Sequence, residues 1–119
     1  MPPDYHMRAE QFGFASPNDI KDALNAADTQ VLDVRNTDEI AAAGRFDHVN
    51  YKQTNGCTPS ECPALSAAPQ DFCPDKEATV VIYCRSGRRA NAAKDILIGQ
   101  GYSRVLNAGG YDDVIATMA

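Results

Sequence analysis

The feature that most constrains the fold is an apolar run, Ala78 to Tyr83, that a helical pattern follows after a short loop. Nearly every residue of the run is apolar, which is typical of a strand buried on both faces of a parallel sheet. Beyond Cys84 and a glycine-bearing loop, apolar residues recur at helical spacing until Gly99. A buried strand that leads through a tight loop into a helix predicts a parallel βαβ arrangement.

The rest of the chain repeats this alternation of strand and helix patterns. Strands are predicted at 30–34 and 104–107, and helices at 17–27, 37–43 and around 114–118. Ser16 and Pro17 are typical of a helix start. Strands that alternate with helices are joined by right-handed crossovers, which place helices on both faces of the sheet. The sequence therefore predicts an α/β fold with an open, mostly parallel sheet and helices on both faces.

Length and charge narrow the classes of function. The 119 residues, 44% of them hydrophobic, suit a single domain over residues 1–119. The formal net charge of -5 disfavours binding to nucleic acid or to acidic membranes. No apolar run approaches the roughly 20 residues that span a bilayer, and residues 1–6 lack the pattern of a secretory signal. We therefore expect neither a signal peptide nor a transmembrane segment in this chain, and the compartment stays open.

Cys84 follows the predicted central strand, at the edge where open parallel sheets bind their ligands. The loop amides, the start of the next helix and the side chains of Arg85, Arg88 and Arg89 all favour a thiolate there. Gly87 allows the tight turn that such a cradle needs. Three of the 11 cationic side chains fall within residues 85–89, which indicates a small anionic substrate. The alternative is a buried, unreactive cysteine beside a solvated helix start.

The loop Cys84-Arg85-Ser86-Gly87-Arg88-Arg89 resembles the active-site loop of rhodanese-type sulfurtransferases. Leu32-Asp33-Val34-Arg35, together with Glu39, is similar to the first signature of that family. The stretch from Gly101-Tyr102 to Gly109-Gly110-Tyr111 is similar to its closing stretch. The resemblance extends from about Ser16 to Ile115, apart from an insertion, and implies a single rhodanese-like domain.

The resemblance implies a thiosulfate sulfurtransferase that needs no cofactor. Cys84 would take a sulfane sulfur from a small anionic donor such as thiosulfate and hold it as a persulfide. It would then pass the sulfur to cyanide or to a thiol acceptor, including a thiol on an acceptor protein. Asp33 and Arg35 are implied to support the site through ion pairing. The implied substrate-binding residues are Arg85, Ser86, Gly87, Arg88 and Arg89.

Two stretches depart from the family pattern. The usual Gly-His-Ile-Pro-Gly-Ala-like stretch is replaced by Gly44-Arg45-Phe46-Asp47-His48-Val49, and Glu39 stands where some thiosulfate-using relatives carry a cation. Phosphatases related to rhodanese use a loop one residue longer, which would need an arginine at position 90, where this chain has Ala90. Phosphatase chemistry and a non-catalytic rhodanese-like binding module remain the alternatives.

A Cys/Pro-rich insertion at about 53–76 differs from the rest of the chain. It contains four prolines and three of the four cysteines, and no period is sustained through it. We expect a mostly irregular segment that contributes little to the core, with at most a short helical turn near 64–68. The spacing of Cys57, Cys62 and Cys73 argues against a zinc site, so no metal is predicted. A disulfide within the insertion, surface thiols, and a cysteine that resolves the Cys84 persulfide all remain open.

Overall fold

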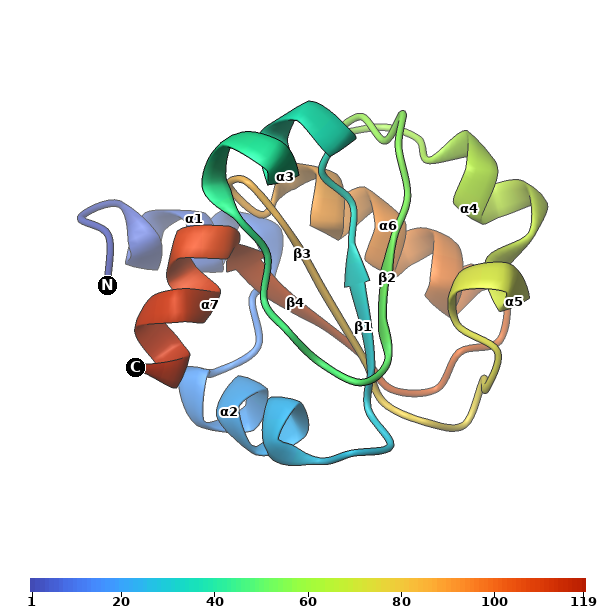
Figure 1. The fold of residues 1–119 in the computed structure, drawn as a ribbon, viewed down its shortest axis with the longest axis horizontal. Coiled ribbons are helices and arrows are strands. Elements are labelled where there is room, and N and C mark those ends of the chain that lie inside the picture. The colour runs from blue at the N-terminus through green and yellow to red at the C-terminus, as the bar shows by residue number, and fades with distance from the viewer.

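The computed structural model describes residues 1–119 as a four-stranded parallel sheet with the strand order β2-β1-β3-β4 (Figure 1). The strands are β1 (Gln30–Asp33), β2 (Tyr51–Gln53), β3 (Val80–Cys84) and β4 (Val105–Gly110). The helices are α1 (Tyr5–Phe12), α2 (Pro17–Asn25), α3 (Thr37–Ala43), α4 (Pro63–Ala67), α5 (Pro69–Phe72), α6 (Arg88–Gly99) and α7 (Tyr111–Met118). None of these helices is long and apolar enough to span a bilayer.

Strand β3 lies inside the sheet and is buried on both faces, as its apolar run predicts. Val80, Ile82 and Cys84 belong to a hydrophobic cluster on the face covered by α6, with α4 beside it. Val81 and Tyr83 belong to a second cluster on the face covered by α2 and α7. The predicted α/β fold, an open parallel sheet with helices on both faces, is therefore confirmed.

The predicted helix starts are present with their capping residues. The Ser16 hydroxyl accepts a hydrogen bond of 3.1 Å from the backbone N–H of Asp19, and Pro17 is the first residue of α2. The backbone N–H of Asn36 donates to the Glu39 carboxylate at 3.0 Å, which closes the first turn of α3. These caps pair backbone groups that a helix end leaves without an intrahelical partner.

The expectation that the insertion contributes little to the core is wrong. Cys62, Leu65 and Cys73 are fully buried and belong to the cluster beneath α6. Helix α4 confirms the predicted short turn near 64–68, whereas helix α5 was not predicted, and each of the two begins at a proline. The buried residues follow no regular spacing, and for that reason periodicity does not reveal them.

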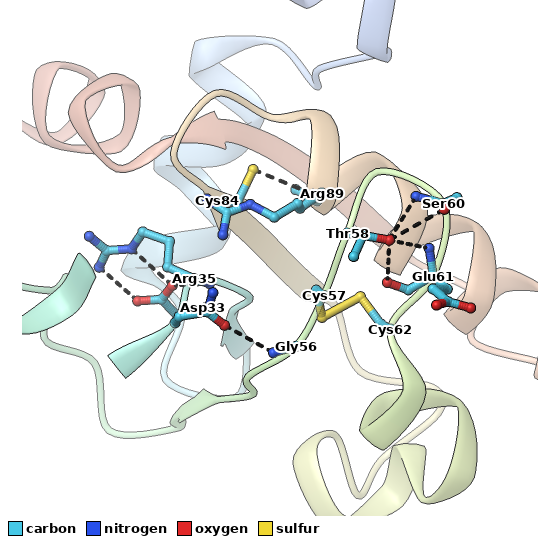
Figure 2. The surroundings of a disulfide bond; sticks show 12 residues. Asp33, Arg35, Gly56, Cys57, Thr58, Ser60, Glu61, Cys62, Cys84 and Arg89 are labelled. Atoms are coloured by element: carbon cyan, nitrogen blue, oxygen red, sulfur yellow. Dashed lines mark hydrogen bonds and ion pairs between the residues drawn. A yellow bond between two sulfur atoms is a disulfide. The ribbon is translucent and has the colours of Figure 1, made fainter. Parts of the chain in front are cut away.

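Cys57 and Cys62 form a disulfide (Figure 2). Cys73 and Cys84 are free. A disulfide within the insertion, one of the alternatives that the sequence leaves open, is therefore present. The free thiol in the insertion, Cys73, is not at the surface, because it is fully buried. Burial raises the pKa of the Cys73 thiol to about 12, so this thiol stays protonated at neutral pH.

Candidate active site

The Cys84 thiol sits at the carboxyl end of β3, inside the turn that leads to α6. Its Sγ accepts hydrogen bonds from the backbone N–H groups of Gly87, at 3.0 Å, and Ala90, at 3.4 Å. Gly87 has a φ of +97°, a left-handed conformation that glycine adopts readily and that folds the loop back over the sulfur. Two N–H groups at a helix start form a cradle suited to a negatively charged sulfur.

The loop also touches the end of β4 very closely. Gly110 pairs with Cys84 in the sheet, and a Cβ at Gly110 would lie 2.0 Å from the carbonyl oxygen of Arg85. Only glycine allows this approach, because any side chain would displace the loop backbone. Gly110, which belongs to the closing stretch 101–111, thus packs directly against the Cys84 loop.

The three loop arginines have different surroundings. Arg89 donates two hydrogen bonds, of 2.6 and 2.8 Å, to the carboxylate of Glu39 on α3. This pairing lowers the pKa of Glu39 to about 2, so the carboxylate is charged at neutral pH. Arg88 is exposed, with its guanidinium 6.0 Å from the centre of the Phe12 ring. Arg85 is exposed and forms no salt bridge, which leaves its charge available to a ligand.

A cavity of about 480 Å³ opens beside the loop. Its wall contains the guanidinium-bearing residues Arg35 and Arg85, and the acidic residues Asp38, Glu39 and Asp112. Because Glu39 is paired with Arg89 and Arg35 with an aspartate, Arg85 is the unpaired cation of this wall. The volume lies within the range of sites that bind small molecules.

Asp33 and Arg35 form a buried ion pair at the end of β1. The Arg35 guanidinium donates to the Asp33 carboxylate at 2.8 and 3.0 Å and to the carbonyl oxygen of Gly44 at 2.8 Å. The Tyr51 hydroxyl donates to the same carboxylate at 2.7 Å. The pair therefore connects β1, β2 and the stretch after α3, in which the sequence departs from the family pattern.

Sequence reasoning missed Arg8, which contacts the loop, and Asp113, which holds Arg8 in place. Arg8 on α1 donates to the carbonyl oxygen of Ser86 at 3.0 Å and to both carboxylate oxygens of Asp113, at 2.7 and 3.0 Å. Asp113 also accepts from the backbone N–H of Gly110 at 2.7 Å, a helix-capping contact that its place three residues after Gly110 could have indicated. No local pattern marks Arg8, which lies 78 residues from Ser86.

Comparisons with known proteins place this architecture in a family. The family model described as "Rhodanese-like domain" matches residues 16–117. Among curated proteins, the chain is similar to thiosulfate sulfurtransferase PspE of Escherichia coli strain K12, at 51% identity over 41 residues. The aligned stretch is 34% of this chain and 39% of that relative, so it spans well under half the length of either protein.

Solved structures show the same fold. A rhodanese with anions from E. coli has a TM-score of 0.53 and 29% identity, over 71% of this chain and 89% of that one. The polysulfide-sulfur transferase homodimer from Wolinella succinogenes has a TM-score of 0.68 at 24% identity, over 96% and 85% of the two chains. The human single-domain sulfurtransferase TSTD1 has a TM-score of 0.57 at 20% identity, over 87% and 95%.

The match at 16–117 contains all four strands and the Cys84 loop. The parallel sheet, the order of its elements and the family match agree with each other. The chain belongs to the rhodanese-like domain family, whose members similar to it include sulfurtransferases.

Proposed function

We propose that the protein is a rhodanese-type thiosulfate sulfurtransferase in which Cys84 holds the transferred sulfur. The observation that supports this most strongly is the pair of backbone N–H groups, from Gly87 and Ala90, directed at Cys84 Sγ. Such donors stabilise negative charge on sulfur both before and after a second sulfur atom is added. The name of the curated relative PspE supports thiosulfate as the donor.

The reaction has two steps. The Cys84 thiolate attacks the sulfane sulfur of thiosulfate, a new S–S bond forms, and sulfite leaves with the electron pair of the donor's own S–S bond. The resulting Cys84 persulfide is then attacked at its outer sulfur by cyanide or a thiolate. The S–S bond to Cys84 breaks, and its electron pair restores the Cys84 thiolate. No outside oxidant or reductant is needed.

The loop residues have separate roles in this reaction. Arg85 attracts the anionic donor into the cavity, because it is the unpaired cation of the wall. Ser86 and Gly87 supply the peptide unit nearest the sulfur, and Arg88 adds positive charge at the exposed helix start. Arg89 is held by Glu39 and fixes the loop against α3. Asp33 and Arg35 support the adjacent wall through their ion pair.

The function is tested by the turnover of thiosulfate and cyanide to thiocyanate. We expect Cys84→Ser to lose this turnover while it keeps its circular dichroism spectrum, because a serine hydroxyl is barely ionised at neutral pH. Cys73→Ala is the matched control, since it removes the other free thiol, which is buried in the insertion. It should retain turnover. Wild-type turnover by Cys84→Ser would contradict the proposal, and hydrolysis of an aryl phosphate by the wild type would favour phosphatase chemistry instead.

A further inference from the structure

The Cys84 loop is contacted by helix α1, which precedes the family match at residues 16–117. The Arg8 guanidinium on α1 donates to the carbonyl oxygen of Ser86 at 3.0 Å, and its side chain is only 12% exposed. Asp113 on α7 fixes the guanidinium with two further hydrogen bonds. Arg8 also contacts a third residue, because its Nε atom lies 3.0 Å from the exposed Asp4 carboxylate, away from the loop.

The carbonyl that Arg8 binds and the N–H that faces the sulfur belong to one peptide unit. The bond between Ser86 and Gly87 is trans, so its C=O and N–H point in opposite directions within one plane. The oxygen end is held by Arg8, and the N–H end donates to Cys84 Sγ at 3.0 Å. A donor fixed on the oxygen therefore sets the direction of the N–H. It also strengthens the N–H as a donor, because hydrogen bonds in a chain polarise one another.

Neighbouring contacts hold the remainder of this turn. The side-chain amide of Asn107 donates to the carbonyl oxygen of Gly87 at 3.0 Å and to that of Phe12 at 3.2 Å. The Phe14 ring packs on Gly87 so closely that a Cβ there would lie 2.2 Å from the ring. Asn107 and Phe14 fix the position of the turn, whereas the Ser86–Gly87 peptide receives its side-chain hydrogen bond from Arg8.

The ion pair between Arg8 and Asp113 is largely buried. Asp113 is 1% exposed and accepts from both the Arg8 guanidinium and the backbone N–H of Gly110. The hydrogen bond to Asp113 raises the pKa of Arg8 above its usual range, so the guanidinium remains charged at any pH at which the protein is folded. The contact to Asp4, by contrast, is exposed to solvent.

We propose that Arg8 is a positioning residue for sulfur transfer, because it orients and polarises the Ser86–Gly87 peptide whose N–H stabilises the negative sulfur of Cys84. The kinetic consequence rests on the proposed sulfurtransferase function, whereas the effect on the Gly87 N–H exists in the resting protein. Arg8 acts through the peptide and does not touch the reacting atoms.

The resting protein offers a direct readout of this role. In protein labelled with ¹⁵N at its eight glycines, the Gly87 amide proton resonance reports the strength of its hydrogen bond to sulfur. We expect Arg8→Gln to move this resonance upfield, because the N–H loses both its fixed direction and its polarisation. Asp4→Asn is the matched control. It removes an ion pair of Arg8 without touching Ser86 and should leave the Gly87 resonance in place.

The kinetic readout separates positioning from donor binding. We expect Arg8→Gln to lower kcat for thiosulfate and cyanide by about tenfold, with KM unchanged, because an orienting hydrogen bond from a charged group is lost. Asp4→Asn should keep the wild-type kcat. An Arg8→Gln variant that is folded and shows both an unmoved Gly87 resonance and a wild-type kcat would overturn the proposal.

Two further outcomes need their own readout: an Arg8→Gln variant that does not fold, and a wild type that does not transfer sulfur. If Arg8→Gln fails to fold, Arg8→Lys replaces it. The single ammonium of Arg8→Lys cannot reproduce the forked contacts of the guanidinium to Asp113 and Ser86. An Arg8→Lys variant whose Gly87 resonance and kcat equal those of Asp4→Asn would therefore overturn the proposal. If the wild type itself transfers no sulfur, the proposed function fails. The Gly87 resonance then still decides whether Arg8 orients the peptide.

Discussion

At the scale of single residues, the ion pair between Glu39 and Arg89 determines which charges face the cavity. The two residues lie 50 positions apart and connect α3 to the start of α6. The sequence places three arginines in the loop, but the charge of Arg89 is neutralised by Glu39. The loop therefore presents less free positive charge than a count of its arginines suggests. Arg85 is left as the unpaired cation of the cavity wall, and it is the residue that we propose attracts an anionic donor.

The Glu39–Arg89 pair predicts a pH-dependent contribution to stability. Its pairing lowers the folded-state pKa of Glu39 from an ordinary value of about 4.5 to about 2. The contribution is therefore complete above about pH 4.5 and is lost as the pH falls toward 2. We expect Glu39→Gln to lower the free energy of unfolding at pH 7 by about 1 kcal/mol. The difference from wild type should shrink below pH 4.5 in denaturant titrations.

Asp38→Asn is the matched control for this prediction. Asp38 lies on the same helix and on the same cavity wall, but it forms no salt bridge. Its substitution should change stability little at either pH. A Glu39→Gln difference that stays constant from pH 7 to pH 2 would show that the carboxylate charge does not stabilise the fold.

At the scale of elements, the parts predicted correctly are those with a local signal. Strand β3, the Cys84 loop and α6 are contiguous, and their order in the chain already places the thiol at a helix start. The pairing of Asp33 with Arg35, which the family resemblance implies, also joins residues only two positions apart. The pairing of Arg8 with Asp113 spans 105 residues and depends on the docking of α1 against the end of β4, which no local pattern indicates.

Apart from α1, which has eight residues, the elements that the sequence did not reveal are short or irregular. Strand β2 has three residues, of which only Tyr51 is apolar, so its sequence is too short to show an apolar run or an alternation. In the insertion, helices α4 and α5 have five and four residues, too few for a helical period to appear. Leu65 and Cys73 are buried there because they dock beneath α6, a tertiary contact. Proline content favours a loop, yet two of the four prolines of the insertion, Pro63 and Pro69, each begin a helix.

The disulfide of the insertion gives a prediction at this scale. Cys57 and Cys62 are five positions apart, and closing so short a loop stabilises the fold by about 2 kcal/mol. We expect the double variant Cys57→Ala/Cys62→Ala to lose about this much in denaturant titrations. It should still transfer sulfur to cyanide, because cyanide attacks the Cys84 persulfide directly. In Figure 2 the Cys84 sulfur points toward the start of α6 and away from the bridge.

A reductant provides the control for this effect. Adding it should lower the stability of the wild type and of Cys73→Ala, both of which keep the bridge, and leave the double variant unchanged. A reductant that has no effect on the wild type would argue against the bridge. A Cys84 persulfide that persists longer in the double variant would indicate that one of the two cysteines resolves it.

At the scale of the whole molecule, the two hydrophobic clusters lie on opposite faces of one sheet and share its central strands. Leu32 and Ile82 belong to one cluster, and Val31 and Val81 to the other. Neither cluster can persist once β1 and β3 separate, so we expect the chain to unfold as a single domain. Calorimetry should show one transition with an enthalpy of about 80 kcal/mol near 60 °C, equal to the van't Hoff enthalpy. Two transitions, or a calorimetric enthalpy well above the van't Hoff value, would contradict this.

Whether Cys84 carries the transferred sulfur is tested most directly by mass spectrometry after incubation with thiosulfate and removal of the donor. We predict that the wild type gains the mass of one sulfur atom, that peptide mapping places it on Cys84, and that cyanide removes it. Cys84→Ser should gain nothing under the same conditions. Sulfur found on another cysteine, or the same gain in Cys84→Ser, would contradict the assignment of Cys84.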